Sequence, residues 1–195
     1  MNLGELRRAV HRRSGIDYEP TALNEVINEA VQHIATEGDW PWLERFSSLV
    51  LVPGTGTYVM PADWQRTRSL TVDGDEVPFV SVRDIDDTDE ETFGYSTSGD
   101  SFTLSPTPTT AGTARMRYIA VENVLTDDSH SPKLPAAYHG AIVNWATAEV
   151  KRRKGDLAGA REYGTIYEGW LARIRKGITR ATGPRRVRVR PGGAL

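Results

Sequence analysis

Residues 23–35 read Leu-Asn-Glu-Val-Ile-Asn-Glu-Ala-Val-Gln-His-Ile-Ala, and their spacing decides the class of fold. The apolar residues recur at intervals of three and four, which places them on one side of an α-helix. Thr21 stands where an N-cap belongs, and Gly38-Asp39 followed by Pro41 ends the pattern. Because such a helix must bury its apolar side against another element, the sequence predicts an amphipathic helix within a larger core.

Three further segments have the same helical period. One precedes the first stretch, carries Leu3, Leu6 and Val10, and ends at Ser14-Gly15. The other two lie near the C-terminal end and meet at Gly155: the earlier begins at Pro135, and the later begins after Asp156, a predicted N-cap. The sequence therefore predicts one pair of helices near each end of the chain.

The period changes to two between residues 46 and 122, which is typical of short antiparallel strands. Turn residues separate the runs, as at Asp73-Gly74-Asp75 and Ser98-Gly99-Asp100. The acidic stretch Asp84–Glu91 is expected to be either one helical turn or a mobile loop, and we favour the partial helix. The predicted strands are Ser48–Val52, Thr57–Met60, Ser69–Val72, Val77–Val82, Ser101–Ser105 and Ala114–Val121.

This order of elements predicts an α+β fold in three parts. Residues 1–45 and 133–180 are expected to form a four-helix bundle from the N-terminal and C-terminal helix pairs, because each pair alone would leave its apolar side exposed. Residues 46–132 are expected to form an inserted antiparallel β unit. Residues 181–195 are expected to form an extended C-terminal arm.

Charge is distributed unevenly along the 195 residues, although the formal net charge is only −2. No acid follows Glu168, and eight Lys and Arg residues do, which leaves −10 on residues 1–168. This pattern predicts two different surfaces for two different partners. The densest acidic part, expected to face a channel or the solvent, is made of Asp84, Asp86, Asp87, Asp89, Glu90 and Glu91.

Residue types and spacings argue against most catalytic chemistry. The chain has no cysteine, which excludes disulfides, thiolate metal sites and cysteine nucleophiles, and its four histidines have no metal-binding spacing. It contains no GxSxG motif and no phosphate-binding loop. We therefore expect no catalytic residues, no cofactor and no metal. A cell-wall glycan hydrolase stays open as an alternative, with Glu37 or the acids of Asp84–Glu91 as the general acid.

The basic C-terminal arm and the segment Asp39-Trp40-Pro41-Trp42 are the candidate interaction sites. The arm alternates Arg and Val with the period of a strand, so it can pair with a sheet edge of a partner; a DNA-binding module is the alternative. The two tryptophans either close the helical core or form a recognition platform, and we favour the core. The arm's candidate residues are Arg185, Arg186, Val187, Arg188, Val189, Arg190 and Leu195.

Several motifs, in this order, resemble the head-to-tail adaptor (connector) proteins of tailed bacteriophages. The resemblance runs from about Leu3 to Ile178 and rests on the order of the motifs, each of which is loose by itself. The motifs are Leu23-Asn-Glu-Val-Ile-Asn-Glu-Ala30, Asp39-Trp-Pro-Trp-Leu-Glu44, Tyr58-Val-Met-Pro-Ala-Asp-Trp64, Leu104-Ser-Pro-Thr-Pro108, Tyr118, Leu125-Thr-Asp-Asp128, Leu134-Pro-Ala-Ala-Tyr-His139, and Lys154-Gly-Asp-Leu-Ala158 with Ala160 and Tyr163.

The resemblance implies a structural protein of the virion neck that is made in the host cytoplasm. Such a protein forms a ring of twelve copies under the portal protein, extends the DNA channel without sequence-specific contacts, and presents a surface to the next tail or neck protein. The resemblance also implies that the C-terminal arm binds the portal. No segment is apolar for long enough to span a bilayer, so no membrane partner is expected.

Overall fold

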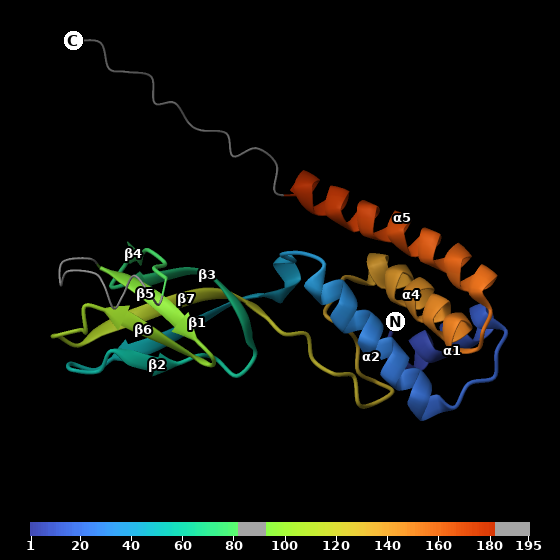
Figure 1. Cartoon of the computed structure of the whole chain (residues 1–195), viewed down its shortest axis with the longest axis horizontal. Coiled ribbons are helices and arrows are strands. Elements are labelled where there is room, and N and C mark those ends of the chain that lie inside the picture. The colour runs from blue at the N-terminus through green and yellow to red at the C-terminus, as the bar shows by residue number, and fades with distance from the viewer. Residues whose placement is uncertain (82–92, 182–195) are drawn as a thin grey trace, which may run out of the picture. The chain divides into compact units, whose positions relative to one another are not determined.

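The computed structural model describes residues 1–81 and 93–181, with side chains up to Ile178, and within them the fold is α+β, as predicted. The chain divides into two compact units. One is helical and combines Met1–Val31 with Val124–Leu195; the other, Gln32–Asn123, contains the strands. Figure 1 labels the elements of both.

Helix α1 (Leu3–Ser14) begins and ends at defined caps. The Asn2 side chain accepts a hydrogen bond from Glu5 N at 2.9 Å, and Glu5 accepts one from Asn2 N at 3.0 Å, which forms a capping box. Gly15 ends the helix at φ 65°, a left-handed conformation that glycine adopts without strain. The predicted end at Ser14-Gly15 is confirmed.

Helix α2 (Pro20–Thr36) contains residues 23–35, whose spacing predicted an amphipathic helix. Its start differs from the prediction, because Thr21 lies inside the helix and Pro20 is its first residue. The cap is Glu19, whose Oε2 accepts a hydrogen bond from Ala22 N at 2.8 Å. A glutamate does this less often than Ser, Thr, Asp or Asn, which explains why the sequence pattern pointed to Thr21.

The C-terminal helices are α4 (His139–Arg153) and α5 (Leu157–Ala181). Pro135 lies before a short 3₁₀ turn, Ala136–Tyr138, rather than in the first turn of α4. Asp156 caps α5 as predicted, since its Oδ1 accepts a hydrogen bond from Gly159 N at 2.9 Å. Within the helical unit α4 contacts both α1 and α5 (Figure 1). Closure of all four helices into one bundle stays a prediction.

The β unit contains two antiparallel sheets. The four-stranded sheet has the order β1-β7-β3-β4, and the three-stranded sheet has the order β2-β6-β5. A 3₁₀ turn, Pro41–Leu43, precedes β1. The bounds are β1 Glu44–Leu51, β2 Thr57–Val59, β3 Trp64–Val72, β4 Asp75–Val77, β5 Gly94–Ser98, β6 Ser101–Ser105 and β7 Gly112–Ala120.

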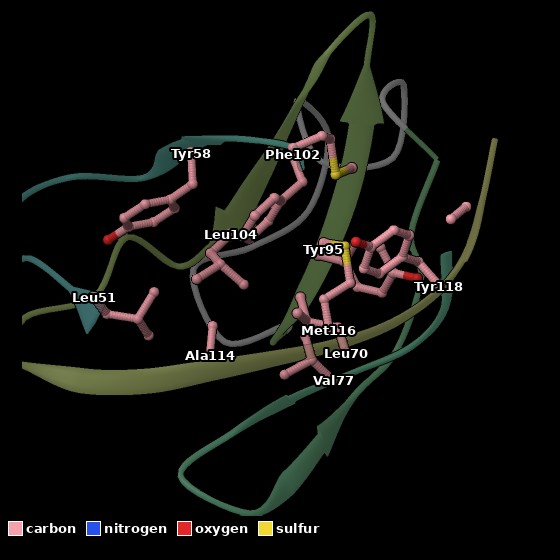
Figure 2. Close-up of a cluster of buried hydrophobic side chains, with 12 residues drawn as sticks. Leu51, Tyr58, Leu70, Val77, Tyr95, Phe102, Leu104, Ala114, Met116 and Tyr118 are labelled. Carbon is pink, nitrogen blue, oxygen red and sulfur yellow. The ribbon is translucent and has the colours of Figure 1, made fainter. Parts of the chain in front are cut away.

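Side chains from both sheets form the core of the β unit. Along β7, Ala114, Met116 and Tyr118 are buried, whereas Thr113, Arg115 and Arg117 point outward. This alternation is what one buried face produces. Figure 2 shows the inward side chains in one cluster, and Tyr58 stacks on Phe102 with a centroid separation of 5.5 Å.

Some strands differ from their predicted bounds for identifiable reasons. The predicted strand Val77–Val82 is interrupted: β4 ends at Val77, and Pro78 has no N–H to continue the ladder. Phe79 then forms an isolated bridge with Tyr95, and Val82 lies outside the described residues. β5 was missed because, apart from Tyr95, it consists of Gly, Ser and Thr. The predicted partial helix Asp84–Glu91 lies outside the described residues.

His139, the first residue of α4, is a buried titratable group with a consequence for stability. It is 3% exposed, and its Nε2 donates a hydrogen bond to Leu134 O at 2.7 Å. Burial is the main cause that lowers the pKa of His139. As the pH falls below about 6.5, the unfolded chain therefore takes up a proton at this position before the folded chain does.

We expect the free energy of unfolding to fall between pH 7 and pH 5, and to fall less steeply in a His139→Gln variant. Glutamine keeps an N–H donor for Leu134 O but does not titrate. Urea denaturation at several pH values measures the slope. Equal slopes for the two proteins would contradict this role of His139.

Candidate interaction surfaces

The two segments that carry the predicted site residues lie outside the described residues. They are the arm, with Arg185, Arg186, Val187, Arg188, Val189, Arg190 and Leu195, and the acidic segment, with Asp84, Asp86, Asp87, Asp89, Glu90 and Glu91. The structure therefore neither brings these residues together nor separates them. Within the described residues, the candidate surfaces lie on helix α5, the outward face of the four-stranded sheet, and helix α1.

Helix α5 leads into the arm and is already basic in its last described turns. Arg173, Arg175 and Lys176 are exposed, whereas Leu171 and Ile174 are buried on the opposite side. The Arg173 guanidinium lies 4.7 Å from the centroid of the Trp170 ring, a cation–π distance. The exposed residues of these last turns thus carry the same charge as the arm that follows them.

Two glycines bring α4 and α5 close together and so fix the position of the end of α5. A Cβ atom at Gly140 of α4 would lie 2.5 Å from the Trp170 ring. A Cβ atom at Gly177 of α5 would lie 2.3 Å from the Tyr138 hydroxyl. The Trp170 side chain of α5 and the Tyr138 side chain of the 3₁₀ turn before α4 thus occupy the space that side chains at Gly140 and Gly177 would fill.

The outward face of the four-stranded sheet contains a hollow of about 540 Å³. Phe46, 58% exposed, lies in it, and the Arg115 guanidinium is 4.8 Å from the centroid of its ring. Arg117 pairs with Glu44, whereas Arg115 has no carboxylate partner among the described residues. This surface was not predicted from the sequence, although the alternation Arg115-Met116-Arg117 indicates one charged face.

Asp39 joins the segment after α2 to strand β3. Its carboxylate pairs with both Arg66 and Arg68, and its own side chain is about one-third exposed. One carboxylate shared by two guanidinium groups holds the Arg66 and Arg68 side chains close together. The sequence predicted Asp39 as part of the helix end and of the candidate segment Asp39–Trp42, but not its pairing with β3.

The two tryptophans next to Asp39 have different exposures. Trp40 is buried, stacks on Trp42 with a centroid separation of 5.1 Å, and donates from Nε1 to Ile34 O at 2.5 Å. This bond satisfies a carbonyl in the last turn of α2. The predicted burial is confirmed for Trp40, which lies in the unit Gln32–Asn123, whereas Trp42 is half-buried.

The motif Leu125–Asp128 holds the first two helices of the helical unit. Asn28 of α2 donates to Leu125 O at 3.0 Å and accepts from Leu125 N at 2.8 Å. Asp128 pairs with Arg7 of α1, and its carbonyl accepts from Gly4 N at 3.2 Å. This motif thus connects α1 and α2 to a segment that is far from both in the sequence.

Wherever the pKa of a carboxyl group in the described part of the chain is shifted, it is lowered, which favours the charged form. Hydrogen bonds from Arg152 lower the pKa of Glu149, those from Lys151 lower that of Asp156, and those from Ser129 lower that of Asp127. A general acid needs the opposite shift. Glu37, the acid proposed for a hydrolase, lies 3.7 Å from His33 Nε2 and is about one-third exposed.

No group of three or more His, Asp or Glu residues in the described part of the chain lies close enough to hold a metal ion. None of the helices described is both long and apolar enough to cross a bilayer.

The close approach of α4 and α5 leads to a stability prediction. We expect Gly140→Ala to lower the free energy of unfolding by about 1–2 kcal/mol, because the new methyl group overlaps the Trp170 ring. Gly169→Ala on the exposed side of α5, where a Cβ atom meets nothing, should raise it by up to about 1 kcal/mol through helix propensity. Urea denaturation checks both; stabilisation by Gly140→Ala would contradict the packing described.

Comparison with known proteins gives one family. A family model described as SU10 adaptor protein matches residues 1–190, which include both compact units and most of the arm. A search of curated proteins finds no match.

Proposed function

Since the chain belongs to the SU10 adaptor protein family, and is thus a structural head-to-tail adaptor of a phage, we propose that it joins the portal to the tail in the virion. In this proposal twelve copies form a ring under the portal protein. The ring continues the DNA channel, which DNA passes without sequence-specific contacts, and its other side receives the next tail or neck protein. The four helices close into one bundle that carries the β unit.

The family match over residues 1–190 carries this proposal, because it covers nearly all of the chain rather than one module. The charge distribution supports it independently. The first 168 residues carry a net charge of −10, whereas the residues after them are basic. The C-terminal end can therefore form an attachment surface that differs from the rest of the chain. The exposed cations at the end of α5 extend that surface into the helical unit.

The arm is the proposed attachment to the portal. An arm that becomes ordered on binding loses conformational entropy, so a single copy should bind weakly. Once the copies are joined in a ring, each further attachment becomes effectively intramolecular, and avidity adds orders of magnitude to the affinity. Weak attachment of one copy and firm attachment of the ring is therefore the expected behaviour.

Deletion of residues 183–195 tests the attachment directly. We expect the truncated chain to fold like the full chain, with the same circular dichroism spectrum, but to lose assembly onto purified portal rings in co-sedimentation. Assembly at the level of the full chain would contradict the proposed role of the arm.

Two variants of the full-length arm that keep its charge separate guanidinium contacts from strand pairing. Lysine at Arg185, Arg186, Arg188 and Arg190 removes the guanidinium groups, whereas serine at Val187 and Val189 removes the apolar alternation. If the arm pairs with a sheet edge of the portal, the serine variant should lose more assembly than the lysine variant. Steeply salt-dependent binding of the single chain to duplex DNA would instead favour a DNA-binding module.

A further inference from the structure

A basic hollow of about 380 Å³ lies along α1 in the helical unit, and neither the family nor the arm accounts for it. Its rim is formed by Arg7, Arg8, His11 and Arg12 of α1, and its lining includes Tyr18 and Leu23. Spacings of one, three and four residues along a helix place these cationic side chains on one side. The hollow therefore combines a charged rim with an apolar floor.

Two of these arginines have no acidic partner. Arg7 pairs with Asp128, but Arg8 and Arg12 are exposed and make no ion pair with any described residue. They are four residues apart, a spacing at which like charges repel across one helical turn. A ligand with negative charge would relieve that repulsion.

The charges around the hollow are predominantly positive. Lys154, at the end of α4, places its Nζ 5.3 Å from the centroid of the Tyr18 ring, which adds a cation beside the hollow. The one carboxylate in the lining, Asp17, is fully exposed and lies 3.9 Å from His11 Nε2. The hollow thus retains an excess of positive charge.

The ligand that fits must carry several negative charges and an apolar side chain. Within this chain, residues 84–87, Asp-Ile-Asp-Asp, have that composition, and four more residues complete the acidic segment to Glu91. Ile85 matches the floor at Tyr18 and Leu23, and the flanking aspartates match Arg8 and Arg12. Phosphates of nucleic acid would supply the charge but have nothing to place on the apolar floor.

We propose that this hollow binds the acidic segment Asp84–Glu91 of a second copy of the chain. The proposal rests on the proposed function, because a closed ring joins each copy to its neighbour through two different, complementary surfaces. The chain carries such a pair, with the hollow on the helical unit and the acidic segment within the sequence of the β unit. Contact between the two surfaces would join neighbouring copies of the ring.

A peptide titration tests the recognition. A fluorescently labelled peptide of residues 82–92 is added to the full chain, and binding is followed by anisotropy at 50 mM salt. We expect saturable binding that weakens as salt is raised. Arg12→Glu should weaken it at least tenfold, and Arg161→Glu, the same charge change at an exposed site on α5, should leave it within twofold.

A peptide with serine at the Ile85 position tests the apolar floor and should bind several-fold more weakly than the natural peptide. Absence of binding, or equal losses from Arg12→Glu and Arg161→Glu, would overturn the proposal. A short DNA duplex that binds at the same site more tightly than the peptide would overturn it as well, because it would identify phosphate as the ligand.

Cross-linking then decides between a second copy and the same chain. Because the chain has no cysteine, His11→Cys and Thr88→Cys create single thiols in two separate proteins, one of them tagged. With a short bis-maleimide, the mixture should give heterodimers in excess of those from Arg161→Cys with Thr88→Cys. A chain with both cysteines that cross-links only within itself would overturn the second-copy assignment. These measurements need no portal, so their failure leaves the adaptor function standing.

Discussion

Burial of α4 on more than one side is the constraint on which the helical unit depends. Ile142, Val143, Ala146 and Thr147 are all at most 1% exposed, so neighbours must cover several sides of this helix. The helix α1 from the start of the chain and the helix α5 from its end both contact α4. The unit can therefore form only when the two ends of the chain come together, although the residues of the β unit separate them in the sequence.

Two polar side chains buried on α4, Asn144 and Thr147, have hydrogen-bond partners. Asn144 donates to Gly140 O at 2.6 Å and accepts from Arg13, and Thr147 donates to Val143 O at 2.7 Å. A buried polar group without a partner would destabilise the fold, so the Arg13–Asn144 bond favours this register of α1 on α4. On another side of α4, the close approach of Gly140 and Trp170 positions α5.

The parts of the fold that were predictable from the sequence are those encoded by local patterns. The apolar spacing in α2, the glycine after α1 and the Asp156 cap each depend on residues a few positions apart. Each therefore predicted a helix, or a helix end, from the sequence alone. The second buried side of α4 was not predictable, because Asn144 and Thr147 look like surface residues until their partners are known. Strand β1 begins four residues before its prediction because residues 44–47 are held by long-range pairing with β7, which includes the Glu44–Arg117 ion pair and has no signal in the local alternation.

The interaction surfaces also divide into those that a local sequence pattern indicates and those that depend on the fold. Charge segregation along the chain is a property of the sequence, and it indicated the arm and the acidic segment directly. The hollow at Arg8 and Arg12 depends on Tyr18 and Lys154 reaching the same place from other segments, which no spacing along the chain indicates. The most direct test of the adaptor account is the mass of the complex formed with purified portal rings, measured by native mass spectrometry. The account predicts one portal ring with twelve copies of this chain, whereas the unbound masses of the two proteins, or a single bound copy per ring, would contradict it.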